Sequence, residues 1–521
     1  MNDLLLTIDN SSIDWARAQF ALTAIYHWLF VPLTLGLAVV MGIVETCWYR
    51  TLKRSEGAVV DKPVDTFWRD AAQFWQRLFG VNFAMGVATG IILEFEFGTN
   101  WSNYSWFVGD IFGAPLAVEG IVAFFMESTF VAVMYFGWKK VSPGFHLAST
   151  WLTGLGATIS AWWILVANAW MQYPVGCAFN PDTMRNEMVS FAEVALSPFA
   201  VGKFCHTVTS SWIIGAVFCV GVCSWYMLKR REPRLSIESM KIGAAVGLVA
   251  SLLAAATGHK SAQDVAAVQP MKLAAMEALY DGGNGVGLKV VEGIEVPNAL
   301  SFMATNDFEG YVPGINNILN GYTTPDGKVE PSVEEKIERG KQAIAALAAY
   351  RKAKQEGAED STLNQQLSIL NENMPYFGYG YIRDKAEVVP PIAVNFWAFR
   401  VMVGLGGLFI LFFAVVLAGA YGWPKALWRD RTITGLPKWH YWIAIALIPL
   451  AYIASESGWL VAEFGRQPWT IQDMLPTWAA VSDLQSSSVM ITFFLFLLLF
   501  TTMLAVEINI LLKQIKKGPE M

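Results

Sequence analysis

Apolar residues along this chain gather in nine long runs separated by polar segments. About 20 consecutive apolar residues are enough to cross a bilayer as a helix, and each run reaches that length. The pattern predicts an all-α fold: a polytopic membrane helical bundle of about nine transmembrane helices. The predicted spans are residues 19–49, 72–97, 112–138, 145–172, 200–228, 239–258, 391–422, 440–465 and 486–512.

Composition supports a membrane protein and excludes several other classes. Of 521 residues, 54% are hydrophobic and only 15% are charged, whereas soluble domains are about one quarter charged. The net charge of −6 and the lack of a long basic run exclude nucleic acid as a partner. The five cysteines show neither a CxxC pair nor zinc-ligand spacing, so neither a disulfide framework nor a zinc site is expected.

One connection is long and charged like a soluble protein. Residues 259–390 contain 30 of the 80 charged residues, including a helix-like segment at residues 333–354. We therefore divide the chain into an N-terminal transmembrane bundle (1–258, six spans), a loop (259–390) and a C-terminal transmembrane bundle (391–521, three spans).

The positive-inside rule orients the chain. The loops after spans 1, 3, 5 and 7, together with the C-terminal tail, hold 18 lysines and arginines, whereas the N-terminal tail and the loops after spans 2, 4 and 8 hold three. Because cytoplasmic loops are enriched in these residues, we expect the N-terminus and the long loop outside the membrane and the C-terminus in the cytoplasm.

Ionisable residues inside membrane spans are costly and therefore mark candidate functional sites. Those near cytoplasmic helix ends, namely Glu45, Arg77, Lys241 and Glu507, are expected to extend toward the interface. The deeper ones are the stronger candidates. They are His27, Glu94, Glu96, Glu119, Glu127, His206, Arg400, Glu456 and Glu463.

Depth along the spans suggests cofactor chemistry near the outer face. His27, His206, Met402 and Glu463 all fall in the outer half of the membrane, and imidazole, thioether and carboxylate groups can all bind haem iron. A lone membrane histidine is nevertheless more often a packed core residue, and a lone methionine is usually packing. With only five histidines, the chain excludes a haem–copper oxidase and a di-haem cytochrome b.

A proton-coupled transporter or channel is the rival class, since it also explains carboxylates inside helices. Such a protein does not need His206 and Met402 at matching depth. It would also usually show internal repeats or broken helices at mid-membrane.

Long motifs in a fixed order resemble subunit I of the cytochrome bd quinol oxidases over nearly the whole chain. The motifs are Arg17–His27, Gly86–Phe95, Phe97–Ser102, Gly109–Glu119, Trp163–Gln172, Gln269–Glu277 and Gly458–Trp469. The resemblance implies a multi-pass subunit of the bacterial cytoplasmic (inner) membrane. It would oxidise quinol at the outer face and reduce oxygen to water, generating proton motive force without pumping. It would work with a second membrane subunit (subunit II), often with a small single-span subunit.

The resemblance also implies roles for particular residues. His206 and Met402 would bind the iron of a low-spin haem b. His27 and Glu463 would bind the irons of a high-spin haem b and of a haem d or third haem b, and the sequence leaves open which residue serves which haem. Arg400 and Arg466 would pair with haem propionates or hold nearby carboxylates, and Trp459 would pack among the haems.

The remaining implied roles concern protons and quinol. Glu119 would lie beside the oxygen-reducing haem, with Glu127 and Ser160 on the proton path from the cytoplasm. Lys272 and Glu277 in the long loop would serve quinol oxidation. Since five residues separate these two, they are not ideally placed on one helix face and are expected to act from different sides.

Overall fold

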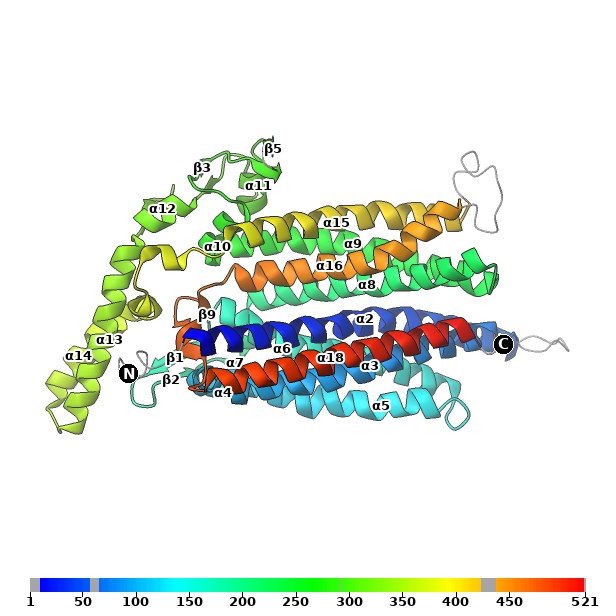
Figure 1. The fold of residues 1–521 in the computed structure, drawn as a ribbon, viewed down its shortest axis with the longest axis horizontal. Helices are drawn as coiled ribbons and strands as arrows, with labels where there is room; N and C mark the ends of the chain where they lie inside the picture. The colour runs from blue at the N-terminus through cyan, green and yellow to red at the C-terminus, as the bar shows by residue number, and fades with distance from the viewer. Residues whose placement is uncertain (1–9, 57–64, 292, 423–436, 520–521) are drawn as a thin grey trace.

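Nine helices in the described part of the chain are long and apolar enough to cross a membrane, as predicted. The structure is a computed structural model that describes residues 10–56, 65–291, 293–422 and 437–519. The spans lie side by side in one bundle (Figure 1). They are α2 (Asn10–Glu56), α3 (Phe67–Thr99), α4–η1–α5 (Ser102–Phe136), α6 (Pro143–Gln172), α8 (Pro198–Lys229), α9 (Pro233–Val268), α15 (Ile392–Ala420), α16 (Lys438–Phe464) and α18 (Ser486–Lys517).

The long segments between spans gather at one end of the bundle (Figure 1), which we call the loop end. It carries residues 173–197, 269–291, 293–391 and 465–485. Its helical elements are α7 (Phe191–Ala195), α10 (Pro270–Met276), α11 (Ala299–Thr305), α12 (Ile315–Asn320), α13 (Val333–Gln355), α14 (Asp360–Asn373), η2 (Met374–Tyr381), η3 (Lys385–Val388) and α17 (Thr477–Ala480).

The strands of the described chain form short antiparallel pairs, all at the loop end. For example, Cys177 lies opposite Met188 in the first pair. The pairs are β1 (Cys177–Asn180) with β2 (Arg185–Met188), β3 (Gly283–Asn284) with β6 (Tyr311–Val312), β4 (Leu288–Val291) with β5 (Ile294–Val296), β7 (Tyr322–Thr323) with β8 (Val329–Glu330), and β9 (Trp469–Ile471) with β10 (Leu475–Pro476).

The main apolar core is shared by helices from both ends of the sequence. It includes Leu37 of α2, Trp75 of α3 and Phe413 of α15, all fully buried. Helix α8 packs against α2, α9 and α16, while α15 packs against α9 and α16. Helices from the predicted N-terminal and C-terminal bundles thus surround one core.

The third span is less regular than its hydropathy suggests. The sequence predicts it at residues 112–138, but its helix begins at Ser102 and contains a break at Gly109, where φ is +44°. A π-helical segment, η1 (Glu119–Phe124), follows, and α5 (Phe125–Phe136) completes the span. Such π-helical turns are rare and are frequent at functional sites, and this one begins at a candidate residue.

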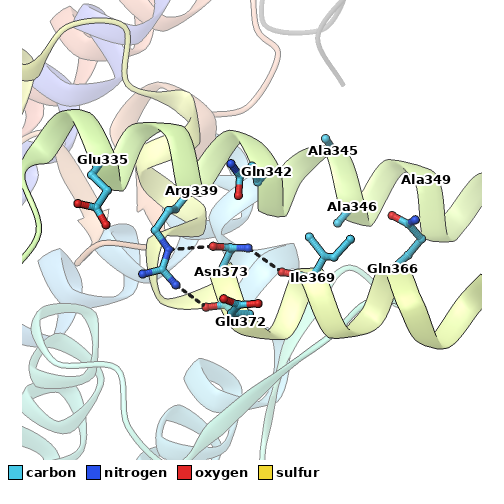
Figure 2. Close-up of a pocket in the computed structure, with 10 residues that line it drawn as sticks. All are labelled: Glu335, Arg339, Gln342, Ala345, Ala346, Ala349, Gln366, Ile369, Glu372 and Asn373. Atoms are coloured by element: carbon cyan, nitrogen blue, oxygen red, sulfur yellow. Dashed lines mark hydrogen bonds between the residues drawn. The ribbon is translucent and has the colours of Figure 1, made fainter.

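The predicted loop helix at residues 333–354 is confirmed as α13, and it pairs with α14 in a hairpin. Figure 2 shows Arg339 of α13 reaching across to α14, where it donates to Asn373 Oδ1 at 2.9 Å and to the Glu372 carbonyl at 3.2 Å. An open groove of about 800 Å³ runs between the two helices. None of the predicted site residues lines this groove.

Candidate functional site

A cavity of about 460 Å³ lies among α2, α3, α4, α6 and α16 toward the loop end. Four predicted cofactor residues, which come from distant parts of the sequence, line it together: His27, Trp459, Glu463 and Arg466. The rest of the wall is mainly apolar and aromatic, which suits a flat macrocycle such as haem. Aromatic members of the wall include Phe20, Trp28, Phe97, Trp101 and Phe112.

The imidazole of His27 is held by Thr89 of α3. The distance from His27 Nδ1 to Thr89 Oγ1 is 2.9 Å, and the same hydroxyl donates to the carbonyl of Met85 at 3.0 Å. Because the hydroxyl proton points at a carbonyl, the oxygen accepts from Nδ1–H. The proton is therefore on Nδ1, and the lone pair of Nε2 is free for a metal.

The imidazole of His206 is held in the same way by Thr257 of α9. Nδ1 lies 3.1 Å from Thr257 Oγ1, which donates to the carbonyl of Leu253 at 2.8 Å. A glycine follows each threonine. A Cβ at Gly90 would lie 3.0 Å from His27 Cε1, and one at Gly258 would lie 3.1 Å from His206 Cε1. The Thr-Gly pairs thus let each helix approach the ring that it orients.

Met402 and His206 lie on two helices that share the same neighbours. The helix of Met402, α15, and the helix of His206, α8, both pack against α9 on one side and α16 on the other. A Cβ at Gly458 of α16 would lie 3.0 Å from Met402 Sδ, so α16 also carries a glycine where it passes the sulfur. The topology is compatible with one haem between α8 and α15.

Glu463 lies at the centre of a polar cluster at the loop end of the cavity. Its Oε2 pairs with Arg466 Nη2 at 2.5 Å, and its Oε1 accepts from Asn168 Nδ2 at 3.1 Å. Lys203 donates to Asn168 Oδ1 and lies 5.2 Å from the ring centroid of Trp459. The cluster therefore gathers positive charge around a single carboxylate.

The carboxylate of Glu463 pairs with only one of the three guanidinium nitrogens of Arg466. Its Nε and Nη1 atoms are buried, and within the described residues neither has a hydrogen-bond partner. An unpaired buried guanidinium nitrogen costs free energy, and carboxylate oxygens are the acceptors that arginine favours. A haem propionate fits this requirement, so the residues around the cavity fit the cofactor that the sequence resemblance implies.

Lys272 and Glu277 point to different partners, as their spacing suggests. Lys272 is 3% exposed and donates to Gln172 Oε1 at 2.6 Å and to Gln269 Oε1 at 2.7 Å. Glu277 is 1% exposed and pairs with Arg400 Nη2 at 2.7 Å. Arg400 thus contacts a carboxylate in the structure, and its functional role stays a prediction.

The two loop residues have displaced pKa values because they are buried. Burial raises the pKa of Glu277 to about 7, and the charge of Arg400 opposes that rise. Burial holds the pKa of Lys272 well below its usual value, and the positive charges of Lys203 and Arg466 lower it further. Burial therefore brings the pKa of Glu277 close to neutral pH and favours the uncharged form of the Lys272 amine.

The predicted proton-path residues meet on one side of α6. Ser160 donates to Glu119 Oε1 at 2.5 Å, whereas Glu119 Oε2 is buried with no hydrogen-bond partner in the described chain. Glu127 is 7% exposed, and a Cβ at Gly156 of α6 would lie 2.7 Å from its Cγ. The three predicted residues thus share one helix surface.

Several site residues are not predicted as such from the sequence. Thr89 and Thr257 could be identified from the sequence, because each is followed by a glycine on the span after the one that carries a candidate histidine. Lys203 stands out in the sequence only as a charge at the mouth of a span. Asn168, a neutral residue in an apolar span, gives no signal.

Comparisons with known proteins agree with the geometry. The family model described as cytochrome bd terminal oxidase subunit I matches residues 15–519. The chain is 39% identical over 525 residues to cytochrome bd-II ubiquinol oxidase subunit 1 of Escherichia coli (strain K12), covering 97% of each protein. It is 34% identical to cytochrome bd ubiquinol oxidase subunit 1 of Bacillus subtilis (strain 168), covering 98% of this chain and 95% of the relative.

A solved structure shares the fold. The bd oxidase from Geobacillus thermodenitrificans superimposes with a TM-score of 0.74 at 21% identity, over 98% of this chain and 99% of that one. The nine apolar helices in the described residues make this chain a multi-pass membrane protein. Because the family model covers almost its full length, the chain belongs to the cytochrome bd terminal oxidase subunit I family.

Proposed function

We propose that this chain is the haem-binding subunit of a quinol oxidase, which oxidises quinol at the loop end and reduces oxygen to water. The observation that carries the proposal is the matching pair of histidines. His27 and His206 each have Nε2 left free by a threonine on the neighbouring helix. A transporter has no need for two such prepared metal ligands.

Three haems are assigned to these ligands, as the resemblance implied. His206 and Met402 would hold a low-spin haem b. His27 and Glu463 would serve a high-spin haem b and a haem d or third haem b, and Arg466 and Trp459 would help to hold these cofactors. When bound, the haems carry electrons one at a time from quinol to oxygen.

The residues of α10 and its neighbours handle the quinol. Glu277 accepts a proton from the quinol hydroxyl, and its pKa of about 7 suits transfer at neutral pH. Lys272 donates a hydrogen bond to the quinol oxygen from the opposite side of α10. Arg400 holds Glu277 in place and also donates to the carbonyl of Met276, fixing the end of α10.

Protons are released at one end of the bundle and taken up at the other. Quinol protons leave at the loop end, which the charge distribution places outside the bacterial cytoplasmic (inner) membrane, with the N-terminus outside and the C-terminus in the cytoplasm. Protons consumed with oxygen arrive from the opposite end through Glu127 and Glu119, the latter held by Ser160. This placement separates charge across the membrane and generates proton motive force without a pump.

A second membrane subunit is proposed as the partner, with a small single-span subunit where one is present. The names of the relatives call each a subunit of a ubiquinol oxidase. Apolar side chains that face outward on α3, α4–η1–α5 and α18, such as Phe95, Ile121 and Leu498, provide surface for such a partner and for lipid.

The visible spectrum of the purified protein tests the proposal. We expect haem b bands, together with a red chlorin band if haem d is present. His206→Ala and Met402→Leu should each remove the low-spin signal and leave the high-spin signals, whereas the control His440→Ala, at the start of α16, should change none of them. A colourless preparation of natively folded protein would refute the oxidase.

A further inference from the structure

One face of α6 carries polar side chains from His146 to Asn168, with Gly156, Ala157 and Ile164 between them. His146, Ser149, Thr150 and Thr153 follow at intervals of three and four residues, which places them on the same face. All four are at most 1% exposed. The same face continues through Gly156 and Ser160 to Asn168. The polar face therefore runs from the end opposite the loops to the Glu463 cluster.

A carboxylate from a neighbouring element lies against this face at each level. Glu463 meets Asn168, Glu119 meets Ser160, and Glu127 lies against Gly156. The fourth, Glu45 of α2, meets Thr150 and His146 near the start of α6. Only the first three have a role in the proposed function.

The sequence predicts that the side chain of Glu45 extends toward the interface, and this prediction is wrong. The side chain is fully buried, with Oε1 at 2.7 Å from His146 Nδ1. Oε2 accepts from Thr150 at 2.6 Å and from Gln76 Nε2 at 2.9 Å. Trp138 Nε1 donates to Gln76 Oε1 at 3.0 Å, which fixes the amide with its NH₂ group toward the carboxylate.

These bonds determine where the protons are. His146 Nε2 lies 3.0 Å from the carbonyl of Met134, which only accepts, so Nε2 carries a proton. The bond between Nδ1 and Glu45 Oε1 then holds one further proton, on either atom. In both arrangements the pair has zero net charge, which makes a transferable proton tolerable in this apolar surrounding.

We infer that Glu45 and His146 form the proton-loading site of a path along α6 to Glu127 and Glu119. The pair takes one proton from water at the near end of α6 and passes one toward Glu127, so its charge is the same after each transfer. Thr150 to Gly156 is about 9 Å along the helix, a gap lined by Thr153 across which the proposed path needs a short water chain. This inference rests on the proposed function.

The alternative is that the pair only fastens α2 to α6. Glu45→Gln distinguishes a proton-loading role from a purely structural role. The amide that replaces the carboxylate keeps an acceptor for Thr150 and donates a hydrogen bond to Nδ1, but it holds no transferable proton. In the complete oxidase complex, we expect oxygen to reoxidise the fully reduced E45Q enzyme at least about ten-fold more slowly. The haem spectrum and the anaerobic reduction of the haems by quinol should be unchanged.

Two controls sharpen this test. Glu507→Gln removes a carboxyl that is 3% exposed and lies ten residues before the end of α18, a helix that packs against α2 and α3. The reoxidation rate of this variant should stay that of the wild type. Thr150→Val should slow reoxidation and Thr150→Ser should not, since only serine keeps the hydroxyl.

The outcomes are distinguishable. Wild-type rates in E45Q with intact haems would overturn the inference and leave the oxidase standing, as would equal effects of T150V and T150S. If E45Q fails to assemble, the Thr150 pair decides alone. A wild-type protein that lacks haem or consumes no oxygen would instead refute the proposed function.

Discussion

Replacing Thr257 with valine removes one hydroxyl from α9 and keeps the shape of the side chain nearly unchanged. In the structure, that hydroxyl is the acceptor that keeps the proton of His206 on Nδ1. Without it, the imidazole is free to carry its proton on Nε2, where no lone pair is left for iron. The change therefore acts on the proposed low-spin haem through the ligand and leaves the ligand itself in place.

The expected size follows from the loss of a single outer partner. Removing the group that orients a metal-bound histidine typically weakens metal binding about 10- to 100-fold, which is about 1.4 to 2.7 kcal/mol. The free energy of unfolding should fall less, by about 0.5 to 1.5 kcal/mol, as for one ordinary hydrogen bond. T257V should therefore lose low-spin haem before it loses its fold.

The assay is the reduced-minus-oxidised spectrum of the oxidase during dilution or washing in detergent. We expect T257V to lose the low-spin signal first and Thr257→Ser to keep it, since serine restores the acceptor. Thr89→Val should do the opposite, affecting the high-spin site of His27 and sparing the low-spin one. If T257V retains all haems as firmly as the wild type, or both variants affect both sites equally, the proposed role of the threonines is wrong.

The remaining predictions concern the loop end and the proton path. Because burial raises the pKa of Glu277 to about 7, its carboxylate is protonated below that pH, so quinol oxidation should rise as pH increases through about 7, and Glu277→Gln should flatten this rise in steady-state assays. Arg466→Gln should weaken retention of the high-spin haems while the low-spin signal persists, which the same washing assay measures. For Glu127→Gln we expect slowed oxygen reduction with all haems spectrally intact; unchanged turnover would remove Glu127 from the path. Lys354→Ala should leave the thermal unfolding midpoint unchanged, because its ion pair with Asp182 is solvent-exposed.

The number of spans was predictable, because a bilayer imposes a long apolar run on each helix. The span predicted at 72–97 corresponds to α3 (Phe67–Thr99). Local irregularities were not predictable in this way. The break at Gly109 lies before the predicted span 112–138, in a segment that hydropathy assigns to a loop. The π-helical segment beginning at Glu119 lies within the apolar span, where hydropathy carries no information on backbone hydrogen bonding.

The candidate site was predictable as a set of residues and not as a set of contacts. Depth along the spans singled out His27, His206 and Glu463. It failed for Glu45, because depth alone does not show that His146, about one hundred residues away, faces the same carboxylate. It also undervalued Lys203, whose partner Asn168 is neutral and lies on another span.

The distribution of charge suggests why electrons and protons would meet near Glu463. Lys203 and Arg466 lie around one carboxylate there, so the excess of positive charge lowers the energy of an added electron. Along α6, by contrast, the groups facing the polar stripe are carboxyls, which bind protons more readily when a negative charge arrives nearby. In the proposed oxidase, an electron that reached the loop end of the cavity would therefore favour proton uptake by Glu119, whose Oε2 has no hydrogen-bond partner in the described chain. Such electrostatic coupling would let electrons at the loop end favour proton uptake from the opposite end without a conformational change.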